Sequence, residues 1–162
     1  MPGARTDWIE SAGGPLVVMP RSVRADWNGI AGDDYQEACR VDDYLGLVAR
    51  AWGDVLVLGD EPLRTAVVHR PDGPAIVRWM YAPSEERLLD AALNSDLDQL
   101  PPVEMLSIRV LAEPYVLFDS GASGATANRL EFIPPTGTRT VRTYVIKDEE
   151  NEVGLILHRF GV

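Results

Sequence analysis

Short apolar runs, separated by clusters of glycine, proline and aspartate, follow one another along most of this chain. Branched and aromatic residues between such turn clusters are typical of strands. Four runs lie in the first hundred residues: Leu16–Met19, Val55–Leu58, Leu63–His69 and Ala75–Tyr81. Five more follow: Glu104–Leu111, Tyr115–Asp119, Arg129–Ile133, Arg139–Lys147 and Val153–Phe160. The pattern therefore predicts about nine strands.

The segment from Asp34 to about Leu45 has the periodicity of a helix, with its apolar residues on one side. Asp34 and Glu37 have the spacing of a capping box, in which two side chains bond the first backbone amides of a helix. Gly46 follows as a helix stop. Asp42 falls within the apolar stripe, so either the helix ends earlier or the Asp42 carboxylate is hydrogen-bonded in a partly buried place.

Two further helices are predicted. Ser84 is expected to cap a helix that runs to about Leu93. The buried stripe of that helix is expected to be Leu88, Leu89, Ala92 and Leu93. A short helix is expected over Pro20–Asn28, because proline favours a first helical position. Helices set apart from mostly antiparallel strands indicate an α+β fold, and the length fits a single domain over residues 1–162.

The composition is acidic, with 25 aspartates and glutamates against 15 lysines and arginines, a net charge of -10. This balance disfavours nucleic acid and anionic membranes as partners, because both require clustered basic side chains. It permits a basic protein partner. The single cysteine, Cys39, excludes an internal disulfide, and we expect a small buried thiol there. Without a signal-peptide pattern or a membrane-length apolar run, we expect a cytoplasmic protein.

The negative charge is concentrated in two stretches of the sequence. Residues 33–61 hold eight acidic side chains against two arginines, and residues 84–98 hold five against one. These stretches account for the whole net charge, and if they meet in space they form an acidic surface suited to a basic partner. The partner-binding residues we predict are Asp33, Asp34, Glu37, Asp43, Asp60 and Glu61. Three tryptophans in or near loops are either packing residues or anchors for such a contact: Trp8, Trp27 and Trp52.

One short string suggests a different chemistry. Tyr115-Val-Leu-Phe-Asp119-Ser-Gly-Ala-Ser123 is similar to the aspartic-protease signature, in which two carboxylates share a proton and a water. The motif occurs once, so a protease would have to be a homodimer using Asp119. Few residues follow Asp119 in the sequence to form the remainder of a protease lobe. The simpler interpretation is a buried strand that ends at Asp119, with a turn at Ser120-Gly121.

No other motif indicates a cofactor or metal. The two histidines, His69 and His158, are far apart in sequence, and the close-spaced pairs of a zinc site are absent. His158 is expected at an edge or solvent-facing position of a strand. The acidic residues between 33 and 43 lack the alternating spacing of a calcium loop. No glycine-rich phosphate loop is present either. We therefore expect neither a metal nor a cofactor.

Several strings, spread nearly end to end, resemble the immunity protein 21 family of bacterial polymorphic-toxin systems. They are Trp8-Ile-Glu-Ser-Ala-Gly-Gly-Pro-Leu16, Val41-Asp-Asp-Tyr-Leu-Gly46, Val57-Leu-Gly-Asp-Glu-Pro62, Leu117-Phe-Asp-Ser120 and Leu157-His-Arg-Phe160. The resemblance implies a cytosolic, non-enzymatic protein that neutralises a cognate toxin, often a nuclease. It defines no functional residues. The alternatives are a homodimeric aspartic protease and a small-ligand binding domain.

Overall fold

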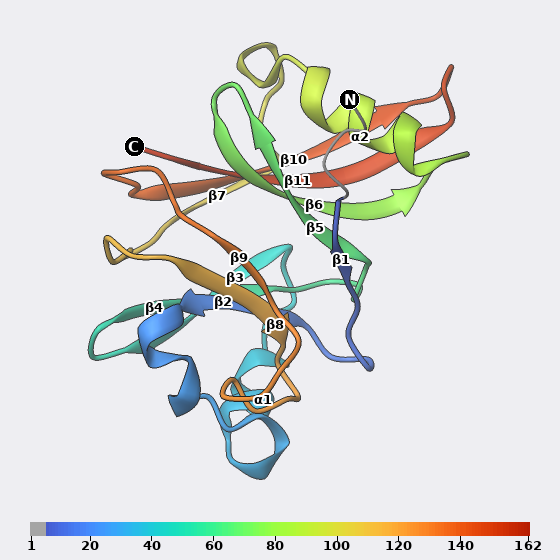
Figure 1. Ribbon diagram of the computed structural model, residues 1–162. Coiled ribbons are helices and arrows are strands. Elements are labelled where there is room, and N and C mark those ends of the chain that lie inside the picture. Colours follow the sequence, from blue (N-terminus) through green and yellow to red (C-terminus); the bar gives the residue numbers. More distant parts are fainter. Residues whose placement is uncertain (1–5) are drawn as a thin grey trace.

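The computed structural model describes residues 6–162, which form eleven strands in two antiparallel sheets (Figure 1). The six-stranded sheet has the spatial order β1 (Trp8–Ile9), β5 (Thr65–Arg70), β6 (Gly73–Tyr81), β11 (Val153–Gly161), β10 (Thr140–Asp148) and β7 (Glu104–Ser107). The five-stranded sheet has the order β3 (Leu45–Arg50), β4 (Gly53–Leu58), β2 (Leu16–Pro20), β8 (Tyr115–Asp119) and β9 (Leu130–Phe132). The predicted α+β class, with mostly antiparallel strands, is confirmed.

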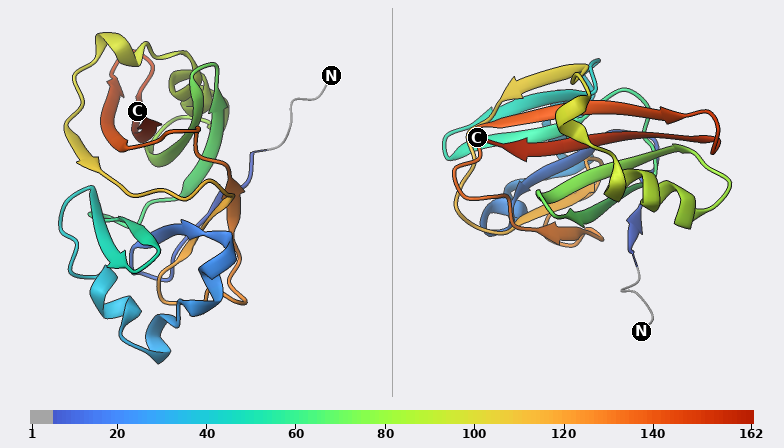
Figure 2. Two further views of the ribbon diagram at one scale, coloured as in Figure 1. Left: turned by 90° about the vertical axis from the view of Figure 1, so that its left-hand side faces the viewer. Right: turned by 90° about the horizontal axis from the view of Figure 1, so that it is seen from above.

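The elements are stacked in layers, from α2 (Glu85–Asn94) at one end to α1 (Asp34–Ala38) at the other (Figures 1 and 2). One apolar cluster lies between α2 and the six-stranded sheet, and a second lies between the two sheets. Side chains that alternate along a strand supply both clusters. In β6, Val77 packs toward α2, whereas Ile76 belongs to the core between the sheets. Three 3-10 helices complete the described chain: η1 (Arg21–Asp26), η2 (Gly29–Ala31) and η3 (Leu97–Gln99).

The helix predicted after Ser84 is present. The Ser84 hydroxyl oxygen accepts a hydrogen bond from the Arg87 amide at 3.2 Å, which satisfies a free donor of the first turn. Leu88 and Ala92 are fully buried against the sheet. Leu93 is an exception to the predicted stripe, because 37% of it is exposed. The predicted short helix after Pro20 is also present, as η1.

The helix predicted from Asp34 to Leu45 is wrong beyond its first turn. The helix α1 ends at Ala38, and Leu45 already begins β3, which pairs with β4 over six residues. Gly46 is therefore not a helix stop but a strand residue whose missing side chain leaves room for Val41. The capping box does not form, because no side chain caps the start of α1. The earlier helix end also explains Asp42, which lies exposed in the loop.

Two burial predictions are also wrong. Cys39 is exposed, and it follows the last residue of α1, which is shorter than predicted. His158 is fully buried, because β11 is not an edge strand but lies between β6 and β10. Strands β1 and β3 add to the nine predicted strands. No helix within residues 6–162 is long and apolar enough to cross a membrane.

Candidate functional site

The structure separates the six predicted partner-binding residues into two neighbouring groups. Asp33, Asp34 and Glu37 lie at the start of α1 and along it. Asp43, Asp60 and Glu61 lie in the loop before β3 and in the turn after β4. The first group therefore lies on α1, and the second lies where β3 of the five-stranded sheet begins and β4 ends. We call the six residues together the acidic surface.

Arg50, at the end of β3, holds two members of the acidic surface. Its guanidinium donates to the Asp34 carboxylate at 2.7 Å and to the Glu37 carboxylate at 3.2 Å. The second Asp34 oxygen accepts a hydrogen bond from the Asn28 amide at 2.7 Å. Asp34 and Glu37 are therefore parts of the local structure. Asp33 is exposed and, within residues 6–162, has no ion-pair partner.

The second group rests on a close contact between two loops. The Gly59 amide donates to the Tyr44 carbonyl at 2.9 Å, and a side chain at Gly59 would overlap the carbonyl oxygen of Asp43. Asp60 has a positive φ of 64°, a conformation that aspartate tolerates better than most residues. The carboxylates of Asp43, Asp60 and Glu61 are all exposed above this contact. The fold thus presents three acidic side chains from a compact pair of loops.

A buried arginine holds these loops from below. Arg78 of β6 is 1% exposed, and its guanidinium donates to the carbonyl oxygens of Tyr44, Gly59 and Glu61 at 3.4, 2.5 and 2.7 Å. Burial lowers the pKa of Arg78 to about 10, and the nearby Asp60 opposes that shift. Arg78 therefore stays charged at neutral pH, and it joins the six-stranded sheet to the acidic surface. In the sequence, the only feature that marks Arg78 is its position as the single cationic residue of an apolar strand.

A partly buried carboxylate makes a second link between the sheets. Glu104 of β7 accepts hydrogen bonds from the amides of Tyr44 and Leu45 at 3.1 and 3.0 Å. Burial raises the pKa of Glu104, and these two hydrogen bonds act against that rise. Glu104 thereby fixes the start of β3 beside the edge of the six-stranded sheet.

The second acidic stretch of the sequence does not join this surface. Residues 84–98 form α2 and the segment after it, on the outer side of the six-stranded sheet. Figure 1 shows α2 and α1 at opposite ends of the stacked layers. The charge concentrated in the sequence is thus divided in space between two separate regions.

The tryptophans occupy three different settings. Trp27 is buried, and its indole N–H donates to the Ser120 carbonyl at 2.8 Å. Trp8 packs edge-on against Trp79, with ring centroids 5.3 Å apart, and the Arg64 guanidinium lies 5.4 Å from the centroid of the Trp8 ring. Trp52 is half-buried in the turn between β3 and β4. Trp52 lines the same pocket as Arg50, which is the ion-pair partner of Asp34 and Glu37.

Asp119 has a structural role at the end of β8. Its two carboxylate oxygens accept hydrogen bonds from the amides of Ala12 and Gly121 at 3.0 and 2.9 Å. These bonds form the expected turn and join it to the loop before β2. The simpler interpretation of the protease-like string, a strand followed by a turn, therefore describes this region.

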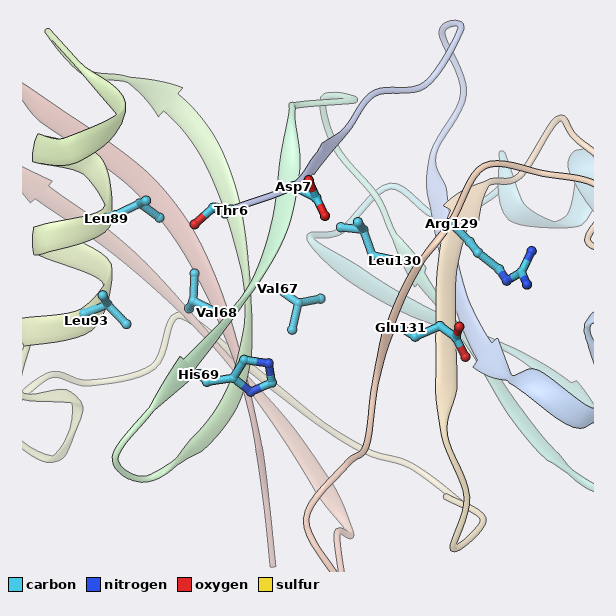
Figure 3. A pocket seen from close by; sticks show the side chains of 10 residues that line it. All are labelled: Thr6, Asp7, Val67, Val68, His69, Leu89, Leu93, Arg129, Leu130 and Glu131. Atoms are coloured by element: carbon cyan, nitrogen blue, oxygen red, sulfur yellow. The ribbon is translucent and has the colours of Figure 1, made fainter. Parts of the chain in front are cut away.

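An open pocket of about 520 Å³ lies between α2, β5 and the segment around β9 (Figure 3). Its lining includes the apolar residues Val67, Leu93 and Leu130. Figure 3 shows Arg129 and Glu131 directed away from His69, so the polar groups do not converge on a ligand. Among residues 6–162, no group of three or more histidine, cysteine or acidic side chains is placed to hold a metal ion.

Comparison with known proteins gives one match. Residues 7–151 match the family described as immunity protein 21. No curated protein matches the chain, and no solved structure does. The match covers most of both sheets and includes every residue of the acidic surface.

Proposed function

Because the chain belongs to the immunity protein 21 family, we propose that it binds a cognate bacterial toxin and neutralises it. The family match is the observation that carries this proposal. Immunity proteins generally act by binding rather than by catalysis, and we propose the same here. The protein would act as a single domain in the cytoplasm of the cell that makes the toxin.

The mechanism we propose is occlusion of the toxin's active surface by the acidic surface. Asp33, Asp43, Asp60 and Glu61 support it, because they are exposed and have no ion-pair partner within residues 6–162. Arg78 holds the carbonyl oxygens of Gly59 and Glu61, on either side of Asp60, so this loop would require little ordering on binding. A nuclease toxin, whose substrate-binding face must be basic, is a partner with matching charge.

The first experiment requires a polymorphic-toxin gene next to the gene for this chain, and it expresses the toxic domain of that toxin with and without this chain in the same bacterium. Restored growth is expected when both are present. Growth arrest despite a well-expressed, folded chain would contradict the proposed function itself.

The second experiment tests the acidic surface through association kinetics. Asp34 and Glu37 are unsuitable for charge reversal, because changing them would also break their ion pairs with Arg50. The pair Asp43→Lys and Glu61→Lys avoids that problem. We expect it to slow association about tenfold or more at low salt, with a weaker salt dependence.

The matched control is the pair Glu86→Lys and Asp90→Lys on α2, which makes the same change in net charge at exposed positions. The control pair is expected to alter association less than the acidic-surface pair. Equal effects of the two pairs would show that only net charge matters, and would contradict this placement of the interface.

A further inference from the structure

A small pocket opens between η1 and the turn that joins β3 to β4. Its volume is about 220 Å³. The apolar lining comes from strand residues Met19 and Val55 and from the rings of Trp27 and Trp52. This volume lies below the range of about 300–1,000 Å³ typical of small-molecule sites, and it suits a single large side chain.

The walls of the pocket are fixed before anything binds. Trp27 is held by its hydrogen bond to the Ser120 carbonyl, and Met19 and Val55 are buried in the five-stranded sheet. Arg50, at one side, is held by Asp34 and Glu37. Because Trp27 and Arg50 do not need to be ordered on binding, a ligand would lose little affinity to the ordering of these two side chains.

The charge around the opening is negative. Arg50 with its two carboxylates carries a net charge of -1. Asp26, the last residue of η1, lines the pocket, is exposed, and makes no side-chain hydrogen bond or ion pair within residues 6–162. An apolar, aromatic pocket with a free carboxylate at its opening matches a side chain that has an aliphatic stem and a cationic end.

We propose that this pocket receives one lysine or arginine side chain of a protein partner. The stem would pack between Trp27 and Trp52, and the cationic end would face Asp26. The proposal rests on the proposed function, since the partner would be the toxin. It adds a specific anchoring point beside the acidic surface, where a buried aromatic pocket contributes more affinity than exposed charge alone.

The first test uses a probe that does not depend on the toxin. Nα-acetyl-arginine amide is titrated into the isotope-labelled protein while the indole N–H signal of Trp52 is followed by NMR. We expect a saturable shift with a dissociation constant on the order of 1–10 mM, because a probe with so few atoms can bind only weakly. Nα-acetyl-leucine amide is expected to bind at least several-fold more weakly.

Two variants sharpen this titration. Trp52→Phe identifies the signal, and Asp26→Asn is expected to weaken the arginine probe several-fold while leaving the leucine probe unchanged. Equal binding of both probes, or an arginine probe insensitive to Asp26→Asn, would overturn the assignment of a cationic occupant. No shift of the Trp52 signal at tens of millimolar probe would overturn the pocket as a binding site.

The second test uses the toxic domain of the neighbouring gene. Trp52→Ala and Asp26→Lys are each expected to lower its affinity tenfold or more. Asp90→Lys on α2 serves as the charge-matched control, and thermal unfolding verifies that each variant folds. If the wild-type chain binds the toxic domain and both pocket variants bind it equally well, the inference is overturned and the proposed function is left intact. Failure of the wild-type chain to bind would instead contradict the proposed function, while the probe titration still decides on the pocket.

Discussion

The imidazole Nδ1 of His158 lies 2.9 Å from the hydroxyl oxygen of Thr143, on neighbouring strands in the interior between the two sheets. Both residues are fully buried, and the other ring nitrogen of His158 has no hydrogen-bond partner in the described structure. Burial, and secondarily the nearby positive charge of Arg78, lowers the pKa of His158 well below its ordinary value. The folded protein therefore holds this imidazole in its neutral form.

The free energy of unfolding is expected to fall between pH 7 and pH 5 because of His158. In this range the unfolded chain binds a proton at His158 that the folded chain does not, so acid favours unfolding. For one proton the slope reaches about 1.4 kcal/mol per pH unit below the ordinary pKa of histidine. Urea unfolding measured across this pH range tests the prediction.

The variant His158→Gln is expected to flatten this dependence, because glutamine cannot take up the proton. His69→Gln, at an exposed position of β5, is the matched control and is expected to keep the wild-type slope. A His158→Gln variant with an undiminished slope would contradict the role given to this residue.

Replacing Arg78 by methionine is expected to reduce the free energy of unfolding by about 2–4 kcal/mol. Methionine keeps an unbranched apolar stem, but it leaves the carbonyl oxygens of Tyr44, Gly59 and Glu61 without their donor. Chemical denaturation gives the magnitude, and hydrogen exchange should show faster exchange at residues 59–61 than elsewhere. A loss below about 1 kcal/mol would argue against the guanidinium as the support of these loops.

Gly59→Ala is expected to destabilise the protein by about 1–3 kcal/mol, as overpacking does. The added methyl group would overlap the carbonyl oxygen of Asp43 and crowd Val41, so the backbone must move. Gly161→Ala is the matched control, because its nearest neighbour would be the Thr140 hydroxyl at 3.8 Å. Thermal unfolding of both variants is sufficient, and similar effects from the two would disprove the close approach of the loops.

Asp119→Ala is expected to cost about 1–3 kcal/mol of stability, because two backbone amides lose their acceptor. Asp119→Asn keeps one carbonyl oxygen and should cost less. Denaturant unfolding of the pair provides the comparison. If alanine is tolerated as well as asparagine, the hydrogen bonds of the Asp119 carboxylate do not hold this end of the sheet.

Local pattern was sufficient to predict much of the fold. The strands β8, β10 and β11 lie within one or two residues of their predicted bounds, and α2 begins where Ser84 indicates. These segments have clear turn residues at both ends. An apolar run between such turns has few alternatives to a strand.

The errors arise where distant contacts override local preference. The local pattern predicts a helix that continues to Leu45 and stops at Gly46, whereas pairing with β4 makes both residues part of the strand Leu45–Arg50. The burial of His158 depends on the position of β11 within its sheet, which sequence spacing does not specify. For the same reason, the sequence located the acidic stretches but could not show that α1 and α2 lie apart.

The position of β11 also bears on how this protein is made. It is the last strand in chain order, yet it lies between β6 and β10, while β2 pairs with β8 about a hundred residues later. Neither sheet is complete until most of the chain has left the ribosome, and such distant pairing folds slowly. Arg78 pairs with Ile156 of β11, so we expect the loops that it supports to become ordered only after β11 has been made. Under the proposed function, binding of the toxin would therefore begin only after a delay that follows the synthesis of β11.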